Sequence, residues 1–181
     1  LEPRPEAHIR GLQFESSVDA GTVSCEVACE GVAGGSTVAI TVLDDAKDPV
    51  TSAEAQVSAG SAHLTLNISN ARTWSTEDPY LYRARVRLSN GDTTDTVHSY
   101  FGHREVGTAA MGDVDATCIT LNGRPVYTQG ALDQSFTPEG VYAYLSNEHI
   151  RRHLQAAKDA GFNMLRLHIK LEDPRYLAWA D

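Results

Sequence analysis

The 181-residue sequence is short of cysteine, of basic residues and of long apolar runs, and each shortage excludes a class of protein. Its three cysteines, Cys25, Cys29 and Cys118, include no Cys-x-x-Cys pair, and an odd number does not build a disulfide framework. Fifteen basic against 24 acidic residues give a formal net charge of −9, which disfavours nucleic acid as a partner. No apolar run approaches the roughly 20 residues that span a bilayer. We therefore expect a soluble globular chain that binds neither membrane nor nucleic acid.

The chain also gives no sign of a leader, a metal or a cofactor. Its first residues lack the basic and apolar regions of a signal peptide, which slightly favours the cytoplasm but leaves the compartment of a longer parent protein open. Cys25 and Cys29 stand at even spacing in a β pattern, so we expect buried free thiols on one strand face rather than metal ligands or a disulfide. His103 has no second metal ligand at a suitable spacing.

Residues 6–106 show the alternation of short half-buried strands. Val23, Cys25, Val27 and Cys29 alternate with smaller or polar residues, and the same period of two recurs over 38–42, 62–68 and 80–88. Clusters of glycine, proline, asparagine and aspartate separate these runs. About seven strands in about 100 residues is the size and rhythm of an immunoglobulin-like β-sandwich.

Residues 107–125 predict a connection to a second domain. The small and acidic residues from Gly107 to Asp115 are typical of a linker, and Asn122-Gly123 favours a tight hairpin. The next candidate strand covers Val126 to Leu132. We expect the second domain to occupy residues 126–181.

The clearest predicted helix begins after Ser146, a good N-cap, and ends at Gly161. Its apolar stripe consists of Ile150, Leu154, Ala157 and Ala160. A strand from Asn163 to Lys170 should follow. Another helix should start at Asp173-Pro174 and begin its apolar surface with Tyr176, Leu177 and Trp179.

The two faces of that predicted strand differ in chemistry. Leu165, Leu167 and Ile169 should face the preceding helix, while the opposite face carries Met164, Arg166, His168 and Lys170. In an open sheet those basic side chains would meet solvent. In a parallel barrel they would line the lumen.

Four segments in this order resemble glycoside hydrolase family 2, which holds the β-galactosidases, β-glucuronidases and β-mannosidases. Trp74 to Tyr82 resembles the family's Trp-(polar)-Pro-x-Leu-Tyr segment, and Phe101 to Val106 resembles its Phe-Gly-x-Arg segment. Leu121 to Val126 is similar to its Leu-Asn-Gly-(basic)-Pro segment, and Phe162 to His168 to its Asn-x-x-Arg strand.

The resemblance implies a mostly β chain, with an immunoglobulin-like sandwich followed by a truncated βαβ unit from the start of a (β/α)8 barrel. A whole barrel takes about 250 residues. It also implies that the parent is a retaining β-glycosidase whose two catalytic glutamates lie beyond Asp181, so that this piece is inert and needs no cofactor. Glu139, Glu148 and Glu172 sit in a loop or at helix starts, where we expect structural roles.

The resemblance also implies substrate-binding residues for a carbohydrate in the parent. Arg166 matches the family's arginine beneath the catalytic centre, and His168 resembles its substrate-side histidine, although the family's spacing is one residue longer. Asp133 and Gln134 fall where the first strand opens into the pocket. Each of these residues also has a structural alternative. Arg166 would be a partner in an ion pair, His168 a buried histidine with its hydrogen bonds satisfied, Asp133 a loop cap and Lys170 an exposed residue at a strand end.

A rival interpretation is a non-catalytic immunoglobulin-like binding or spacer module with an α/β appendage. A coding sequence that stops near Asp181 would favour it, and about 200 further residues would favour the hydrolase. In either case we expect self-association through residues 126–181, because two parallel strands leave unpaired edges.

Overall fold

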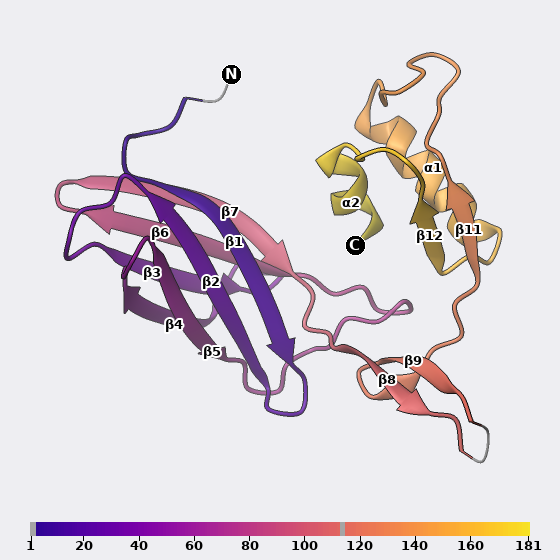
Figure 1. Ribbon diagram of the computed structural model, residues 1–181, viewed down its shortest axis with the longest axis horizontal. Helices are drawn as coiled ribbons and strands as arrows, with labels where there is room; N and C mark the ends of the chain where they lie inside the picture. Colours follow the sequence, from indigo (N-terminus) through magenta and orange to yellow (C-terminus); the bar gives the residue numbers. More distant parts are fainter. Residues whose placement is uncertain (1–2, 113–114) are drawn as a thin grey trace. The chain divides into compact units, whose positions relative to one another are not determined.

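The computed structural model describes residues 3–112 and 115–181, which form two compact units (Figure 1). Unit 1 comprises Leu1–Ala109 and Thr120–Arg124, and unit 2 comprises Ala110–Ile119 and Pro125–Asp181. Part of the linker expected at 107–115 lies outside the described residues. Each unit has its own apolar cluster of buried residues.

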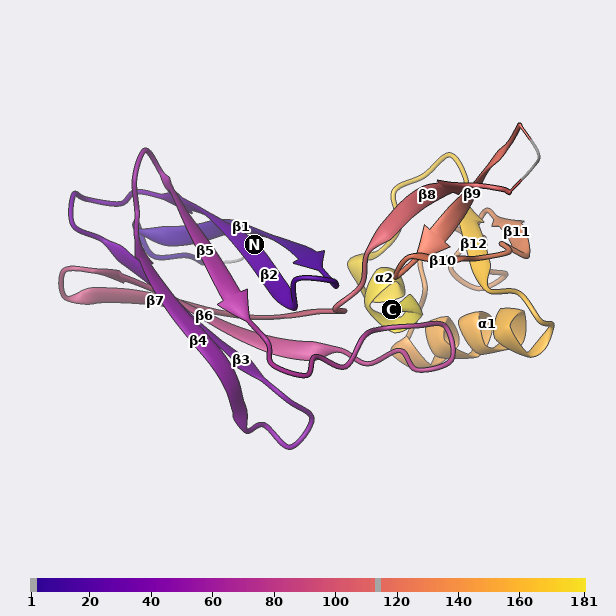
Figure 2. The same cartoon turned by 90° about the horizontal axis from the view of Figure 1, so that it is seen from below.

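Unit 1 is built on two antiparallel sheets that form a sandwich (Figure 2). One sheet has the order β1-β2-β5 and the other the order β4-β3-β6-β7. The strands are β1 (His8–Ser17), β2 (Thr22–Glu30), β3 (Thr37–Leu43), β4 (Pro49–Gln56), β5 (Ser61–Asn67), β6 (Tyr82–Asn90) and β7 (Thr93–Phe101). Seven strands in two sheets confirm the immunoglobulin-like sandwich expected from the alternating pattern.

The core of unit 1 comes from the inward residues of both sheets. Val23 and Val27 from β2 and Val38, Ile40 and Val86 from β3 and β6 have no exposed surface. The residues between them along β2 and β6 are mostly exposed, so the period of two in the sequence follows the two faces of each sheet. Burial of the inward apolar side chains is the main stabilising term for this unit.

The cysteines of β2 are buried free thiols, as expected. Cys25 is 1% exposed and Cys29 8% exposed, and neither forms a disulfide. Burial raises the pKa of the Cys25 thiol to about 12, which suppresses the reactive thiolate at neutral pH.

Iodoacetamide at pH 8 should therefore modify half-buried Cys118 in the folded chain and leave Cys25 unmodified. All three cysteines should react once guanidinium unfolds the chain. Peptide mapping by mass spectrometry reads out both results. Equal alkylation rates at Cys25 and Cys118 before unfolding would contradict the buried placement.

Three of the four family-like segments meet along one seam of unit 1. The Trp74 backbone N–H donates to the carbonyl of His103 at 3.0 Å, and the Asn122 side-chain amide donates to the carbonyl of Trp74 at 3.0 Å. A β-carbon at Gly102 would lie 3.0 Å from the Trp74 ring, so glycine permits this close approach. Tyr82, at the end of the first segment, is buried in the core of the sandwich.

A small sheet of order β10-β9-β8 follows the sandwich. It consists of β8 (Val106–Ala110), β9 (Thr117–Leu121) and β10 (Arg124–Pro125). Asn122 and Gly123 have φ of 50° and 73°, the left-handed pair that a tight hairpin turn requires. The hairpin expected at this dipeptide is thus confirmed.

Unit 2 contains a βαβ unit. β11 (Gly130–Asp133) pairs in parallel with β12 (Met164–Leu167), and α1 (Asn147–Asp159) lies between them in the chain. α2 (Pro174–Ala180) follows. Ser146 caps α1 by accepting from the backbone N–H of His149, and Gly161 leaves the helix with φ of 88°, as expected.

The apolar faces of unit 2 meet around two tyrosines and an isoleucine. Tyr144, Ile150 and Tyr176 are at most 4% exposed, and Leu154, Leu165 and Leu167 pack against them. Ile169 does not join this cluster, so the expectation that it faces the helix is wrong. Its φ is +63°, which ends the strand's alternation and leaves the side chain 77% exposed.

Candidate functional site

The candidate site lies at the carboxyl ends of β11 and β12. The two strands are parallel and Asp133 pairs with Leu167, so both strands end at the same edge of the sheet. Residues 134–146, here called the β11–α1 loop, leave from this edge, and His168 leaves from it on the other strand. In complete parallel barrels, function is found at the carboxyl ends of the strands.

Asp133 faces the helices rather than the open side of this edge. Its Oδ2 accepts from the Tyr176 hydroxyl at 2.5 Å and lies 2.8 Å from Nε2 of His153, and its Oδ1 accepts from the Ser135 backbone N–H at 2.7 Å. The residue is only 9% exposed, whereas its neighbour Leu132 is 53% exposed on the other face. The carboxylate therefore links the end of β11 to α1 and α2, a different placement from the pocket lining expected.

The ionised form of Asp133 is the stable one. Burial by itself raises the pKa of this carboxyl, but hydrogen bonds from Tyr176, His153 and the Ser135 N–H together hold it below its usual value. Burial and the bond to Asp133 also raise the pKa of Tyr176, which keeps its hydroxyl protonated as a donor.

Acid should therefore weaken unit 2. A carboxyl whose pKa is lower in the folded state contributes stability that is present above its unfolded pKa of about 3.9 and lost as the pH falls through the folded value. We expect the circular dichroism of the helices to decline below about pH 4. Asp133→Asn should reduce this acid dependence, and an unchanged profile in that variant would contradict the role of the carboxylate.

Gln134 and His168 come together at the open edge. The Gln134 side-chain nitrogen lies 3.2 Å from Nδ1 of His168, and the backbone N–H of His168 donates to the carbonyl of Asp133 at 2.9 Å. Because an amide nitrogen only donates, this contact is a hydrogen bond in the tautomer that carries its proton on Nε2 and leaves Nδ1 as the acceptor. Gln134 is exposed and His168 half-buried, so the pair presents amide and imidazole groups that can hydrogen-bond hydroxyls.

Arg166 is exposed on the same strand face as Met164. It makes no ion pair or side-chain hydrogen bond with another described residue. The alternative role for Arg166, a structural ion pair, requires an acidic partner. The described part of unit 2 provides none. The guanidinium is thus available to a carboxylate from elsewhere.

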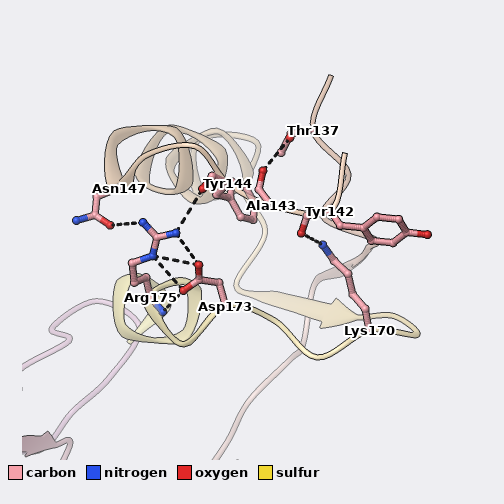
Figure 3. Close-up of polar contacts among 8 residues, drawn as sticks. All are labelled: Thr137, Tyr142, Ala143, Tyr144, Asn147, Lys170, Asp173 and Arg175. Carbon is pink, nitrogen blue, oxygen red and sulfur yellow. Dashed lines mark hydrogen bonds and ion pairs between the residues drawn. The ribbon is translucent and has the colours of Figure 1, made fainter. Parts of the chain in front are cut away.

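Lys170 fixes the β11–α1 loop, a role that the sequence did not reveal. Its Nζ donates to the carbonyl of Tyr142 at 3.3 Å (Figure 3). It also donates to the carbonyl of Ser135 at 2.9 Å and lies 3.5 Å from the Glu172 carboxylate. The same nitrogen lies 5.6 Å from the centroid of the Phe136 ring. The Lys170 side chain is 15% exposed, so the alternative of an exposed strand end is wrong.

Arg175 holds the far end of the same loop (Figure 3). Its guanidinium binds the Asp173 carboxylate at 2.6 Å, the Tyr144 carbonyl at 3.3 Å and the Asn147 side-chain oxygen at 3.3 Å. The Arg175 side chain lowers the pKa of Asp173 to about 2, and Asp173 also caps α2. Two cations that follow β12 thus hold the carbonyls of the loop that follows β11.

Only part of this arrangement was visible in the sequence. Asp173-Pro174 marked the start of α2, which places Tyr176 one turn in, but nothing marked its hydroxyl as the partner of Asp133. His153 stands on α1 beside the expected stripe. Its contact with Asp133 depends on the register of α1 against β11, which local pattern does not fix.

The described residues contain no group of three or more side chains that could hold a metal ion. His103 is fully buried in unit 1, and burial lowers the pKa of its imidazole, which favours the neutral ring. Among the helices described, none is long and apolar enough to cross a membrane.

Comparison with known proteins gives a consistent family. Residues 7–104 match Glycosyl hydrolases family 2. A putative beta-glucuronidase of Formosa agariphila is 34% identical over 109 residues, which cover 60% of this chain and 12% of that protein. A beta-galactosidase of Lactococcus lactis is 25% identical over 118 residues, or 64% of this chain and 11% of that protein.

Solved structures extend the similarity to almost the whole chain. A glycosyl hydrolase family 2 member from Bacteroides cellulosilyticus superposes with a TM-score of 0.81 at 21% identity, covering 96% of this chain and 24% of that one. The Ruminococcus gnavus β-glucuronidase superposes with a TM-score of 0.80 at 20% identity, covering 98% of this chain and 29% of that one. At this identity the superpositions show the fold, and the chain spans about a quarter of each structure's length.

Proposed function

Because the chain belongs to glycosyl hydrolases family 2, we propose that it is part of a β-glycoside hydrolase that cleaves O-glycosidic bonds of a carbohydrate. The relatives bear the names beta-glucuronidase and beta-galactosidase, which supports a β-glycoside as the substrate class. The matched region covers only about a tenth of those proteins, so the activity is proposed for the intact protein. In it, residues 6–106 form the sandwich domain, 107–125 the connection, and 126–181 the start of the barrel.

The proposed reaction retains the anomeric configuration. One carboxyl protonates the leaving oxygen while a second, roughly 5 Å away, attacks the anomeric carbon, and water then releases the sugar. The glutamates in the barrel segment do not offer such a pair. The Glu172 side chain is 3% exposed beside Lys170, Glu148 begins α1, and Glu139 lies in the β11–α1 loop. We propose that residues outside this chain supply both carboxyls and that the chain alone is inert.

The residues of this chain would bind and orient. Arg166, exposed and without a charge partner among the described residues, would hold the nucleophilic carboxylate in its ionised form. Gln134 and His168 would hydrogen-bond sugar hydroxyls, His168 as a donor through Nε2. Asp133, enclosed by its three donors, would position Gln134 rather than touch the sugar. The observation that carries this proposal is the convergence of Gln134 and His168 at the carboxyl ends of two parallel strands.

The test compares the full-length protein with this chain on 4-nitrophenyl β-glucuronide and β-galactoside. We expect turnover by the full-length protein only. Arg166→Ala in that protein should lower kcat by about a hundredfold or more, as for loss of a preorganised charge contact, whereas Arg152→Ala on the exposed side of α1 should not. Comparable turnover by the chain alone would refute the assignment of catalysis to residues outside it.

We also propose that the chain self-associates through residues 126–181 when it is produced alone. Leu132 and Met164 are 53% and 43% exposed on one face of the β11–β12 pair, and Phe136 and Tyr142 are exposed in the β11–α1 loop. A two-stranded parallel pair also presents backbone groups along its outer edges. Light scattering should show a species larger than the monomer, and a strict monomer would contradict the proposal.

A further inference from the structure

The outward face of the β4-β3-β6-β7 sheet carries three consecutive arginines on one strand. Arg83, Arg85 and Arg87, here called the arginine row, are exposed on β6 and alternate with buried Ala84 and Val86. Alternate residues of a strand lie roughly 6.6–6.8 Å apart along the backbone, so the row places three arginine side chains at even spacing on one strand face.

The neighbours of the arginine row are mostly hydroxyl groups and a further basic residue. On β7, Tyr100, His98 and Thr96 stand directly opposite Arg83, Arg85 and Arg87. On β3, the partners of the same three arginines are Leu43, Thr41 and Ala39. Among the outward strand positions of this sheet the acidic residue is Glu54, which pairs with Ala39 and so lies two strands away from Arg87. The row is therefore poorly compensated by its own sheet.

The outward face of this sheet is basic, whereas the chain as a whole is acidic. None of the three arginines makes an ion pair or a side-chain hydrogen bond within the described residues. With Glu54 they contribute +3 − 1 = +2, so the rest of the sequence contributes −9 − 2 = −11. The overall composition is acidic and does not by itself explain the arginine row. The row is therefore a local property of this one surface.

The fold does not require this row. The inward residues of β6 make the core, and any polar residue would serve at the outward positions. Three like charges on one strand face repel one another, which opposes folding slightly. Arginine differs from other polar residues in its planar fork of donors, which matches carboxylate and sulfate groups with two hydrogen bonds.

We propose that the arginine row binds an anionic polysaccharide, whose sugar residues carry carboxylate or sulfate groups. An extended chain with repeated anions complements a row of evenly spaced cations, and the Thr41 and Thr96 hydroxyls beside Arg85 and Arg87 can bond sugar hydroxyls. This surface belongs to unit 1 alone and does not depend on the proposed hydrolase activity.

Other polyanionic partners fit this face less well. Protein interfaces are centred on buried aromatic or apolar anchors, whereas the middle of this face holds arginine, histidine and threonine. Single-stranded nucleic acid needs aromatic platforms for its bases, and here the aromatic residue facing the row is Tyr100, at one end. The excess negative charge elsewhere on the chain also repels a long nucleic acid.

The experiment titrates the 181-residue chain with oligogalacturonate, which carries carboxylates, and with chondroitin sulfate oligosaccharide, which adds sulfates. A neutral cello-oligosaccharide of matched length and a single-stranded DNA oligonucleotide are run in parallel. We expect at least one anionic oligosaccharide to bind, with an affinity that falls as salt rises. The comparison of the first two probes identifies whether carboxylate alone is sufficient.

Replacing the arginine row with glutamine (R83Q/R85Q/R87Q) should weaken that binding about tenfold, the size expected for three exposed charge contacts. The matched control, R10Q/R124Q/R152Q, removes the same charge from exposed arginines elsewhere and should change the affinity less than twofold. Circular dichroism and thermal unfolding should show both variants folded. The proposal is overturned if neither anionic sugar binds, if the neutral sugar or the DNA binds equally well, or if the two variants behave alike.

Discussion

Replacement of Asp133 by alanine should lower the free energy of unfolding of unit 2 by about 3–5 kcal/mol, the cost of breaking a buried charged network. The change leaves the Tyr176 hydroxyl, on a side chain that is 1% exposed, and the Ser135 backbone N–H without their acceptor. It also removes the carboxylate that pairs with His153 of α1. A loss of this size is a large part of the stability of a small domain.

The helices provide a clean measurement of this effect. Both described helices, α1 and α2, belong to unit 2, while unit 1 contains the seven strands of the sandwich. Denaturant unfolding followed by circular dichroism at the helix wavelength should therefore shift to lower denaturant, and the sandwich transition should stay in place. Glu139→Ala, an exposed carboxyl in the β11–α1 loop, is the control and should change little.

The Tyr176→Phe variant distinguishes the contribution of the hydroxyl to stability from that of the aromatic ring. It keeps the aromatic packing and removes the hydrogen bond to Asp133, so we expect a loss of about 1–2 kcal/mol, smaller than that of Asp133→Ala. A loss for Asp133→Ala no larger than that of the Glu139 control would show that the carboxylate does not hold β11 to the helices.

Replacement of Lys170 by methionine is the second large change. Methionine keeps an unbranched stem but removes the amino group that binds the carbonyls of Ser135 and Tyr142. It also leaves the Glu172 carboxylate, 3% exposed, without its cation. We expect unit 2 to lose about 3 kcal/mol, because an unpaired buried charge is costly.

The β11–α1 loop should also become mobile in this variant. Chymotrypsin should then cleave after Phe136 or Tyr142 faster than in the original chain, since loops that open locally are cut first. Lys158→Met, on the exposed side of α1, is the matched control. Addition of Glu172→Gln to Lys170→Met should restore part of the stability, and no restoration would argue against the ion pair as the cause.

The sandwich and α1 could be predicted because their signals are local. Alternation along β2 and β6 follows burial directly, and Ser146 and Gly161 mark the ends of α1 by backbone chemistry that acts within a few residues. The Asn122-Gly123 turn is of the same kind, because its left-handed backbone is encoded in the dipeptide. The order of the strands within each sheet was not predicted.

The candidate site was less predictable because it depends on tertiary register. The side of the sheet that Asp133 faces depends on which residue begins β11, and the strand begins at Gly130 rather than at Val126. A shift of one residue moves a side chain to the opposite face. The sequence pattern predicted Lys170 on the same strand face as Arg166 because it extended the alternation of β12 beyond Leu167, where the strand ends. The left-handed residue Ile169 ends that alternation, and isoleucine gives no local warning of such a backbone.

The Asn122 side chain shows how little substitution the Asn122-Gly123 hairpin turn can tolerate. Its oxygen accepts from the Glu105 backbone N–H at 3.0 Å and its nitrogen donates to the Trp74 carbonyl at 3.0 Å, while its backbone adopts a positive φ. Glycine would satisfy the turn and lose both bonds, and aspartate would keep an acceptor and lose the donor. The segments around Trp74, Glu105 and Asn122 are far apart in the chain and are joined by this one side-chain amide. In related sequences, a substitution in one of these segments should therefore be accompanied by a compensating substitution in the others.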